Sequence, residues 1–394
     1  MLSKQSLAYG TTRSCIREIF EFGKERAAVV GSENVYDYSL GNPSVPAPAE
    51  VNRAIVDILT EMPSVAVHSY TSASGSNEAR DAIAANLNKR FNTAYTRNNL
   101  YLTCGAAASL CAAFRALTID ESTEFVAIAP YFPEYNVFAA NAGGKLTVVP
   151  ADLNAFQIDF AALEARITAH TQGVIINSPN NPSGVVYTED TIRRLCELMQ
   201  KKSSEFGHPV YIICDEPYRE LSYEGEDPFV PNYYADTIVC YSYSKSLSLP
   251  GERIGYVLVP DAVTDSKNVY AAIAGAARSL GYVCAPSLMQ QMIARCANVM
   301  PDLAPYLRNR DLLYGELTRM GYHCAKPSGA FYLFVEAPGG NAEAFCEAAK
   351  KYDLLLVPGT GFGCPTYMRV SYCVDYEMIK RSLPAFEKVI REFK

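Results

Sequence analysis

The middle of the chain alternates short apolar runs with segments in which apolar residues recur at helical spacing. Several of the runs are unbroken apolar stretches, as expected for strands that are buried on both faces. The expected strands are Phe125–Ala129, Leu146–Val149, Gly173–Asn177, Val210–Cys214, Thr237–Tyr241 and Ile254–Val259. The expected helices are Glu78–Phe91, Ala106–Leu117, Asp159–Thr168 and Thr188–Phe206. This alternation predicts an α/β fold with a mostly parallel central sheet flanked by helices.

The pattern changes after about Tyr282. A long helical segment runs from Pro286 toward Met320 and is interrupted near Pro301 and Pro305. The elements expected after it are a strand at Phe331–Val335, a helix at Ala342–Lys351, short strands near Leu354–Val357 and Met368–Tyr372, and a C-terminal helix. We therefore predict a large α/β domain over residues 43–281 and a smaller α+β domain formed by residues 1–42 and 282–394.

The charge and the cysteines of the chain argue against several classes of protein. The net charge of −7 offers no basic field for nucleic acid or anionic lipid. The twelve cysteines are scattered without a C-x-x-C pair, which favours reduced, buried thiols over a disulfide framework or a metal site. No run reaches the roughly 20 apolar residues needed to span a bilayer, and charged residues interrupt the N-terminus where a signal peptide would be apolar. These features predict a soluble, cytoplasmic protein without bound metal.

The segment from Ser242 to Gly255 carries the most specific chemistry. Lys245 lies next to Ser244, and Arg253 follows eight residues later between two glycines. A lysine that forms an imine needs a neutral amine held near a bound carbonyl. The hydroxyls and the arginine suit a phosphate, so this segment predicts a site that holds pyridoxal 5'-phosphate (PLP) as a Schiff base. The alternative is a surface lysine in a polar loop.

Two of the predicted strands end in residues that suit a bound pyridine ring. Asp215, which follows one of these strands, can pair with a ring nitrogen, and Tyr218 lies near enough in sequence to reach a neighbouring ring oxygen. Another strand runs into a turn rigid enough to aim the Asn181 amide inward as a donor. The alternatives are a helix-capping aspartate, a packing tyrosine and an ordinary turn.

Three weaker signals point to the same kind of ligand. A strand-like run at Leu102-Thr103 precedes the small residues Ala106 and Ala107 at a helix start, where backbone N–H groups can hold phosphate. Phe132 follows a predicted strand and can stack on a planar ring or pack in the core. Arg369 interrupts an apolar strand and suits either a substrate carboxylate or an internal salt bridge.

Taken in order, these motifs resemble the fold-type I, class I PLP-dependent aminotransferases of the aspartate/aromatic aminotransferase-like group. The resemblance covers nearly the whole chain. Its pieces are Leu40-Gly41-Asn42-Pro43, Tyr70 before Gly75, Gly105-Ala106-Ala107, Pro130-Tyr131-Phe132, Asn177 to Gly184, Asp215 with Tyr218, Ser242 to Gly255, Pro327 to Tyr332, Pro358 to Gly363, and Arg369.

The resemblance implies a role for each matching position. Lys245 would form the Schiff base and move the proton between the substrate Cα and the cofactor C4′. Asp215 would pair with the ring nitrogen, while Tyr218 and Asn181 would hold the ring oxygen and Phe132 would stack on the ring. The phosphate would be held by Ser242, Ser244, Arg253 and the backbone of Ala106 and Ala107.

The resemblance also implies a substrate site and an assembly. Arg369, with Gly41 and Asn181, would bind the α-carboxylate of the substrate. Tyr70 would reach the phosphate in the neighbouring subunit, so the enzyme would be a homodimer with shared sites. The expected activity moves an amino group from an L-amino acid to a 2-oxo acid such as 2-oxoglutarate.

Aspartate is the favoured amino donor, although one position departs from the family pattern. Some aspartate-specific members carry a lysine in the phosphate-cradle motif, where this chain has Ala107. Arg13, Arg17 or Arg278 are the candidates to replace that lysine.

Other activities remain alternatives at this stage. A PLP-dependent C–S β-lyase or a decarboxylase would use the same lysine, aspartate and arginine. A PLP-sensing domain of a transcription regulator is disfavoured by the acidic charge and by the short segment of about 40 residues before the fold. A dinucleotide-dependent dehydrogenase is disfavoured because no G-x-G-x-x-G follows a strand.

Overall fold

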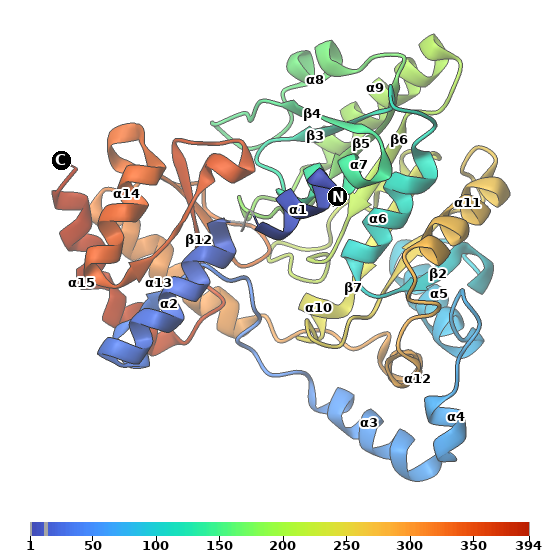
Figure 1. Cartoon of the computed structure of the whole chain (residues 1–394), viewed down its shortest axis with the longest axis horizontal. Coiled ribbons are helices and arrows are strands. Elements are labelled where there is room, and N and C mark those ends of the chain that lie inside the picture. Colours follow the sequence, from blue (N-terminus) through green and yellow to red (C-terminus); the bar gives the residue numbers. More distant parts are fainter. Residues whose placement is uncertain (1, 12–14, 394) are drawn as a thin grey trace.

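The computed structural model describes residues 2–11 and 15–393 and is built around a sheet of seven strands (Figure 1). The strand order is β2-β8-β7-β6-β5-β3-β4. The strands are β2 (Leu100–Thr103), β3 (Glu124–Ile128), β4 (Lys145–Val149), β5 (Thr171–Ile176), β6 (Tyr211–Asp215), β7 (Thr237–Ser242) and β8 (Gly255–Leu258). Only β8 runs antiparallel to its neighbours in this sheet of the described chain, pairing with β7 and β2. The predicted α/β fold with a mostly parallel sheet is confirmed.

Helices cover both faces of this sheet because successive strand residues point to opposite sides. In β6, Ile212 and Cys214 belong to one core, while Tyr211 and Ile213 belong to the other. The first core packs on α3 (Ala49–Glu61), α4 (Ser64–His68), α5 (Asn77–Phe91), α8 (Phe160–Arg166), α9 (Glu189–Phe206) and α12 (Ser287–Cys296). The second packs on α6 (Ala106–Leu117), α7 (Glu134–Ala142) and α11 (Ser266–Ser279).

A second region lies at the left of Figure 1 and contains the C-terminus. Its sheet has the order β11-β12-β9 and is antiparallel. The elements are β9 (Tyr332–Glu336), β11 (Val357–Pro358), β12 (Tyr367–Ser371), α13 (Ala304–Met320), α14 (Ala342–Ala349) and α15 (Tyr376–Arg391). The N-terminal part adds α2 (Cys15–Val30) and the parallel pair β1 (Tyr36–Asp37) and β10 (Leu354–Leu355). The domain boundaries at residues 42/43 and 281/282 stay predictions.

The boundaries of several elements follow from local chemistry. The Thr188 side chain accepts from the backbone N–H of Thr191 and caps α9, as its position in the sequence predicts. The helical segment expected from Pro286 toward Met320 is two helices, α12 and α13. Pro305 lies in the first turn of α13, where its missing N–H is not needed. The helix expected over Ala342–Lys351 ends at Ala349 and continues as a short 3₁₀ turn.

Cysteine pairing and membrane-spanning character can be checked directly. All twelve cysteines lie within the described residues and are unpaired. Among the helices that the structure describes, none combines the length and apolarity needed to cross a bilayer.

Candidate active site

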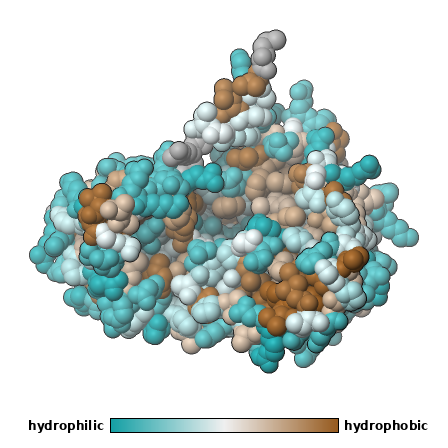
Figure 2. Space-filling model, turned by 60° about the horizontal axis from the view of Figure 1, so that its bottom comes forward, coloured by the Kyte–Doolittle hydropathy of each residue, from teal (hydrophilic) through white to brown (hydrophobic). Residues whose placement is uncertain are grey.

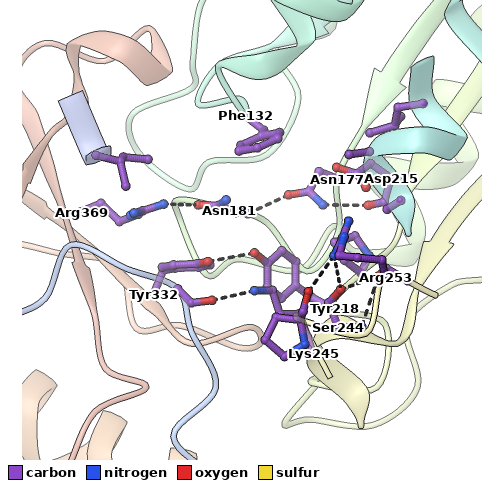
Figure 3. A pocket seen from close by; sticks show the side chains of 18 residues that line it. Phe132, Asn177, Asn181, Asp215, Tyr218, Ser244, Lys245, Arg253, Tyr332 and Arg369 are labelled. Atoms are coloured by element: carbon purple, nitrogen blue, oxygen red, sulfur yellow. Dashed lines mark hydrogen bonds between the residues drawn. The ribbon is translucent and has the colours of Figure 1, made fainter. Parts of the chain in front are cut away.

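A cavity of about 280 Å³ lies at the carboxyl ends of β5, β6 and β7, where α/β sheets bind their ligands. It is closed on the other side by β9 and β12. Figure 3 shows Arg369 and Tyr332 entering from that side, opposite Asp215 and Arg253. The lining residues used below are Ile16, Gly41, Ala106, Ala107, Phe132, Asn177, Asn181, Asp215, Tyr218, Ser242, Ser244, Lys245, Arg253, Tyr332 and Arg369.

Lys245 enters this cavity from α10 (Tyr243–Ser246), the short helix that follows β7. Its Nζ donates to the carbonyl oxygen of Gly41 at 2.6 Å. Burial lowers the pKa of the Lys245 ammonium to about 8, and the cations Arg369 and Arg253 act in the same direction. The amine is therefore neutral far more often near pH 8 than that of an exposed lysine.

Asp215 is buried, and its two carboxylate oxygens differ in their surroundings. Oδ2 accepts from the Tyr135 hydroxyl at 2.6 Å, whereas Oδ1 is buried without a hydrogen-bond partner among the described residues. The Asn177 amide donates to the backbone oxygen of Asp215 at 2.7 Å and fixes the strand end. Burial raises the pKa of Asp215 to about 7, although the Tyr135 hydrogen bond lowers it. A cationic N–H placed at Oδ1 would satisfy that oxygen and favour the carboxylate form.

Hydroxyl and amide groups line the space beside Asp215. The Tyr218 and Tyr332 hydroxyls are 2.8 Å apart, and burial raises the pKa of both phenols, so both keep their protons at neutral pH. The side-chain oxygen of Asn177 accepts from the backbone N–H of Asn181 at 2.8 Å, which holds the Asn181 turn against the cavity. Phe132 lines the same space, with its ring edge-on to that of Tyr135.

The end of the cavity nearest α6 is suited to an anion. Ala106 and Ala107 form the first turn of α6, whose leading N–H groups have no partner within the helix. Arg253 donates to the carbonyl oxygens of Pro250 and Cys104 and approaches the Ser244 hydroxyl at 3.4 Å. The Ser242 and Ser244 hydroxyls are 2.7 Å apart.

Arg369 is a buried cation without a carboxylate partner among the described residues. Its guanidinium donates to the Asn181 side-chain oxygen at 3.0 Å and to the backbone oxygen of Ser39. Its Nε is buried, and no group in the described part of the chain accepts a hydrogen bond from it. The guanidinium also lies over the Tyr332 ring, 4.8 Å from the ring centroid. The internal salt bridge considered for Arg369 is not formed, so its charge is available to an anionic ligand.

Nearly all the residues that the sequence predicts for the site line this one cavity. The exception is Tyr70, which is 86% exposed and does not line the cavity of its own chain. Of the arginines considered as replacements for a lysine at Ala107, Arg17 and Arg278 are not among the lining residues, and Arg13 lies outside the described residues.

Four contributors used above were not nominated as site residues, and one of them, Asn177, stands out in the sequence only as the start of a motif. Tyr135 is signalled only by its place three residues after Phe132, and Tyr332 by its place in a motif. Ile16 of α2 is an ordinary helix residue in the sequence, and only the fold brings it to the cavity.

Comparisons with known proteins agree with this geometry. A sequence profile described as "Aminotransferase class I and II" matches residues 32–386. The chain belongs to this family. It is a PLP-dependent transaminase of class I, and amino acids and their 2-oxo acids are the substrates that the family suggests.

Relatives and solved structures of this family match along most of the chain. A probable aspartate/prephenate aminotransferase of Thermus aquaticus is 30% identical over 330 residues, covering 82% of this chain and 84% of the relative. The crystal structure of an aminotransferase from Eubacterium rectale is 60% identical, with a TM-score of 0.98, and the match covers 100% of this chain and 99% of that one. The aspartate aminotransferase of Thermotoga maritima is 26% identical, with a TM-score of 0.87, over 99% of this chain and 100% of that chain.

The residues present fit PLP. The unpartnered Oδ1 of Asp215 matches a protonated ring nitrogen, and the α6 end of the cavity matches a phosphate. Gly105 precedes α6 with a φ of 87°, and a side chain at this position would meet the Arg253 guanidinium 2.6 Å from the added Cβ. When bound, PLP supplies an aldehyde that condenses with amines and a ring that accepts electrons.

Proposed function

We propose that this chain moves the amino group of an L-amino acid to a 2-oxo acid such as 2-oxoglutarate, with Lys245 bound to PLP as a Schiff base. One observation carries the proposal. Lys245 and the buried, carboxylate-free cation Arg369 line the same cavity. Lys245 can hold a cofactor that binds amines, and Arg369 can bind a carboxylate. Together in one small cavity they select an α-amino acid.

The cofactor roles follow from the contacts described above. Asp215 holds the ring nitrogen through Oδ1, and Tyr135 and Asn177 hold Asp215. The remaining ring and phosphate contacts come from Tyr218, Asn181, Phe132, Ser242, Ser244, Arg253 and the backbone of Ala106 and Ala107.

Lys245 also serves as the acid and base of the reaction. With PLP bound, the Lys245 amine would move the proton between the substrate Cα and C4′ of the cofactor. The lowered pKa of Lys245 suits this role because the amine can hold and release a proton near neutral pH. Gly41 lies next to this amine and, with Arg369 and Asn181, holds the α-carboxylate.

Aspartate is the first amino donor to test. Support comes from relatives, such as the aspartate aminotransferase of Thermotoga maritima, which is 29% identical over 371 residues. The cations among the described lining residues are Lys245, Arg253 and Arg369, each already assigned to the cofactor or the α-carboxylate. A donor panel therefore has to compare aspartate with neutral amino acids under identical conditions.

A homodimer in the cytoplasm completes the proposal. The exposed apolar residues Val56, Leu59 and Val65 lie on α3 and α4, close in sequence to Tyr70, and form a surface suited to a second copy. Figure 2, which brings this side of the molecule forward, shows hydrophobic side chains gathered on the surface. The unpaired cysteines suit a reducing compartment.

The test is a panel of L-amino acids with 2-oxoglutarate and added PLP, followed by the formation of glutamate. We expect glutamate with wild-type protein and none with Lys245→Ala. If transamination occurs, glutamate forms only when both the amino acid and 2-oxoglutarate are present.

The lyase and decarboxylase alternatives give different products. A C–S β-lyase releases pyruvate and ammonia from cysteine conjugates without an oxo acid, and a decarboxylase releases carbon dioxide. Those products in the absence of glutamate would contradict the proposed transamination.

A further inference from the structure

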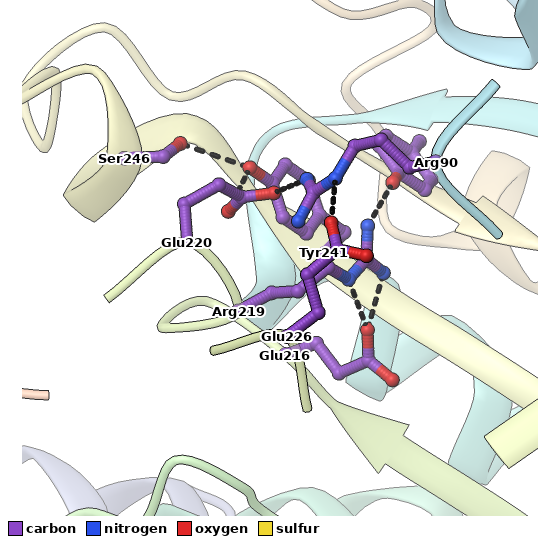
Figure 4. Close-up of polar contacts among 8 residues, drawn as sticks. Arg90, Glu216, Arg219, Glu220, Glu226, Tyr241 and Ser246 are labelled. Atoms are coloured by element: carbon purple, nitrogen blue, oxygen red, sulfur yellow. Dashed lines mark hydrogen bonds and ion pairs between the residues drawn. The ribbon is translucent and has the colours of Figure 1, made fainter. Parts of the chain in front are cut away.

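A buried polar layer lies on the face of the central sheet opposite the cofactor cavity (Figure 4). Successive side chains of β7 point alternately to the cavity side and to the other side of the sheet. Ser242 lines the cavity, and its neighbour Tyr241 lies in the core beneath α5 and α9. The layer therefore contacts the strand that leads into the helix carrying Lys245, and its members Tyr241 and Ser246 do not line the cavity.

Hydrogen bonds connect this layer to the lysine-bearing helix. The Tyr241 hydroxyl donates to Oε2 of Glu220 at 2.7 Å and lies 2.9 Å from the Ser246 hydroxyl. Oε1 of Glu220 accepts from Arg90 at 2.7 Å, in an ion pair whose side chains are 14% and 5% exposed. Because a carboxylate only accepts, the Tyr241 proton points to Glu220, and Ser246 is the donor to Tyr241.

Two neighbouring side chains pack against the ring of Tyr241. The ring stacks on that of Tyr256 with centroids 4.8 Å apart, and the Arg219 guanidinium lies 4.6 Å from the ring centroid. Arg219 is held in turn by an ion pair with Glu216 and by a hydrogen bond to the Tyr256 hydroxyl at 2.9 Å. Burial raises the pKa of Tyr241 well above its usual value, so its hydroxyl remains a donor.

Helix α10 depends on such outside contacts. It has four residues, and one helical turn has little stability of its own. Ser246 follows Lys245 directly in this turn, and its bond to Tyr241 connects α10 to the layer on the other face of the sheet. A small rotation of the turn would displace the Lys245 amine from the cavity.

We propose that Tyr241 and Ser246, anchored by the Glu220–Arg90 ion pair, are positioning residues that hold the helical turn carrying Lys245 at the distance its bond to PLP requires. The inference rests on the proposed role of Lys245, and neither Tyr241 nor Ser246 lines the cavity.

Two truncations test the link. Tyr241→Phe keeps the ring and removes the hydroxyl, and Ser246→Ala removes the donor. For each protein, apo-protein is mixed with PLP, and the visible absorption band of the lysine-bound cofactor gives the rate of capture and the pH midpoint of the band. We expect Ser246→Ala to slow capture about fivefold, the factor that corresponds to about 1 kcal/mol for one buried hydrogen bond. Tyr241→Phe should slow capture at least as much, because it also removes the bond to Glu220. The pH midpoint of the visible band should shift from the wild-type value in the same direction in both variants.

The double variant and a matched control separate positioning from general destabilisation. If Ser246 acts only through its bond to Tyr241, Tyr241→Phe/Ser246→Ala captures PLP no more slowly than Tyr241→Phe alone. Tyr243→Phe is the control: Tyr243 belongs to α10 and its ring packs against Tyr241, but the two hydrogen bonds of the link do not involve its hydroxyl, so the variant should capture PLP at the wild-type rate. Melting temperatures report any loss of folding, and Ser246→Ala carries the test if Tyr241→Phe does not fold.

The outcomes distinguish this inference from the proposed function. Wild-type rates and midpoints in both single variants would overturn the positioning role while leaving transamination intact. Additive effects in the double variant would also overturn it. A wild-type protein that develops no visible band with PLP would contradict the proposed role of Lys245 itself.

Discussion

The two oxygens of the Asp215 carboxylate illustrate how single contacts set the chemistry of the cavity. Tyr135 occupies Oδ2, so only Oδ1 is left to meet a ligand. The hydrogen bond also lowers the pKa of a carboxyl that burial raises to about 7. Tyr135 thus helps to keep Asp215 ionised for its proposed pairing with the ring nitrogen.

Tyr135→Phe should therefore weaken catalysis while leaving the fold intact. We expect kcat to fall about tenfold, which corresponds to about 1.4 kcal/mol, the size of one hydrogen bond to a charged group. Steady-state kinetics with the best amino donor gives the value. Tyr187→Phe removes another buried tyrosine hydroxyl, one that does not line the cavity, and is the control. A wild-type kcat in Tyr135→Phe would contradict the role assigned to this residue.

The pH dependence of PLP capture follows from Lys245. The neutral amine is the nucleophile, and the pKa of Lys245 is lowered to about 8, chiefly by burial. Below that pH the rate of capture should rise about tenfold per pH unit, and above it the rate should level off. Stopped-flow absorbance between pH 6 and 10 measures this, with Lys245→Ala as the blank. A rate that still climbs to pH 10 would indicate an ordinary lysine.

At the residue scale, a site residue can be predicted from the sequence when its polar side chain interrupts or follows an apolar pattern. Asp215, Asn181 and Arg369 stand out because each follows or breaks a strand. Tyr135 and Tyr332 do not stand out, because tyrosines are common in cores and only the tertiary contact reveals their hydroxyl partners.

At the element scale, the start of α6 depends on the one glycine before it. Gly105 has a φ of 87°, which side chains rarely adopt, and its missing side chain leaves room for the Arg253 guanidinium. The turn from β2 into α6 therefore shapes the phosphate end of the cavity.

Gly105→Ala should raise the Kd for PLP about tenfold or more, because both the strained backbone and the displaced arginine distort the phosphate end. Gly143→Ala is a matched control. Gly143 also has a positive φ, of 94°, but an added Cβ there meets nothing closer than 3.9 Å. The control should lose about 1 kcal/mol of stability and bind PLP normally. Equal Kd values for the two variants, measured by fluorescence titration, would contradict this account.

Element prediction succeeded for the central sheet and for several of its helices, and it missed others. The strands of the central sheet and the helices α5, α6 and α9 follow directly from their apolar patterns. Helices α7 and α11 were not predicted. Both contain alanine and other small residues, which give a weaker apolar signal in the sequence than large side chains do.

At the scale of the whole molecule, the cavity combines two regions that are far apart in the sequence. Asp215 and Lys245 come from the central sheet, and Arg369 comes from β12. The sequence predicts the pieces of each region, but their meeting depends on packing between the regions, which no local pattern encodes. Tyr70 is 86% exposed, as the proposed contact with a neighbouring subunit requires.

A shared site can be tested by mixing two inactive chains. Lys245→Ala removes the amine, and Tyr70→Ala removes the contact proposed to reach the neighbouring subunit. After joint refolding, a mixed dimer contains one site with both residues intact, so activity should return to about a quarter of the wild-type value. Light scattering checks the dimer. Failure to restore activity would show that Tyr70 does not act in the neighbouring site.

The central claim is that Lys245 carries the cofactor of this transaminase. Borohydride reduction of the PLP-loaded protein fixes the bond between cofactor and amine, and peptide mass spectrometry then locates it. We predict a single modified lysine, Lys245, and no stable adduct in Lys245→Arg. An adduct on another lysine, or none in the wild-type protein, would contradict the account.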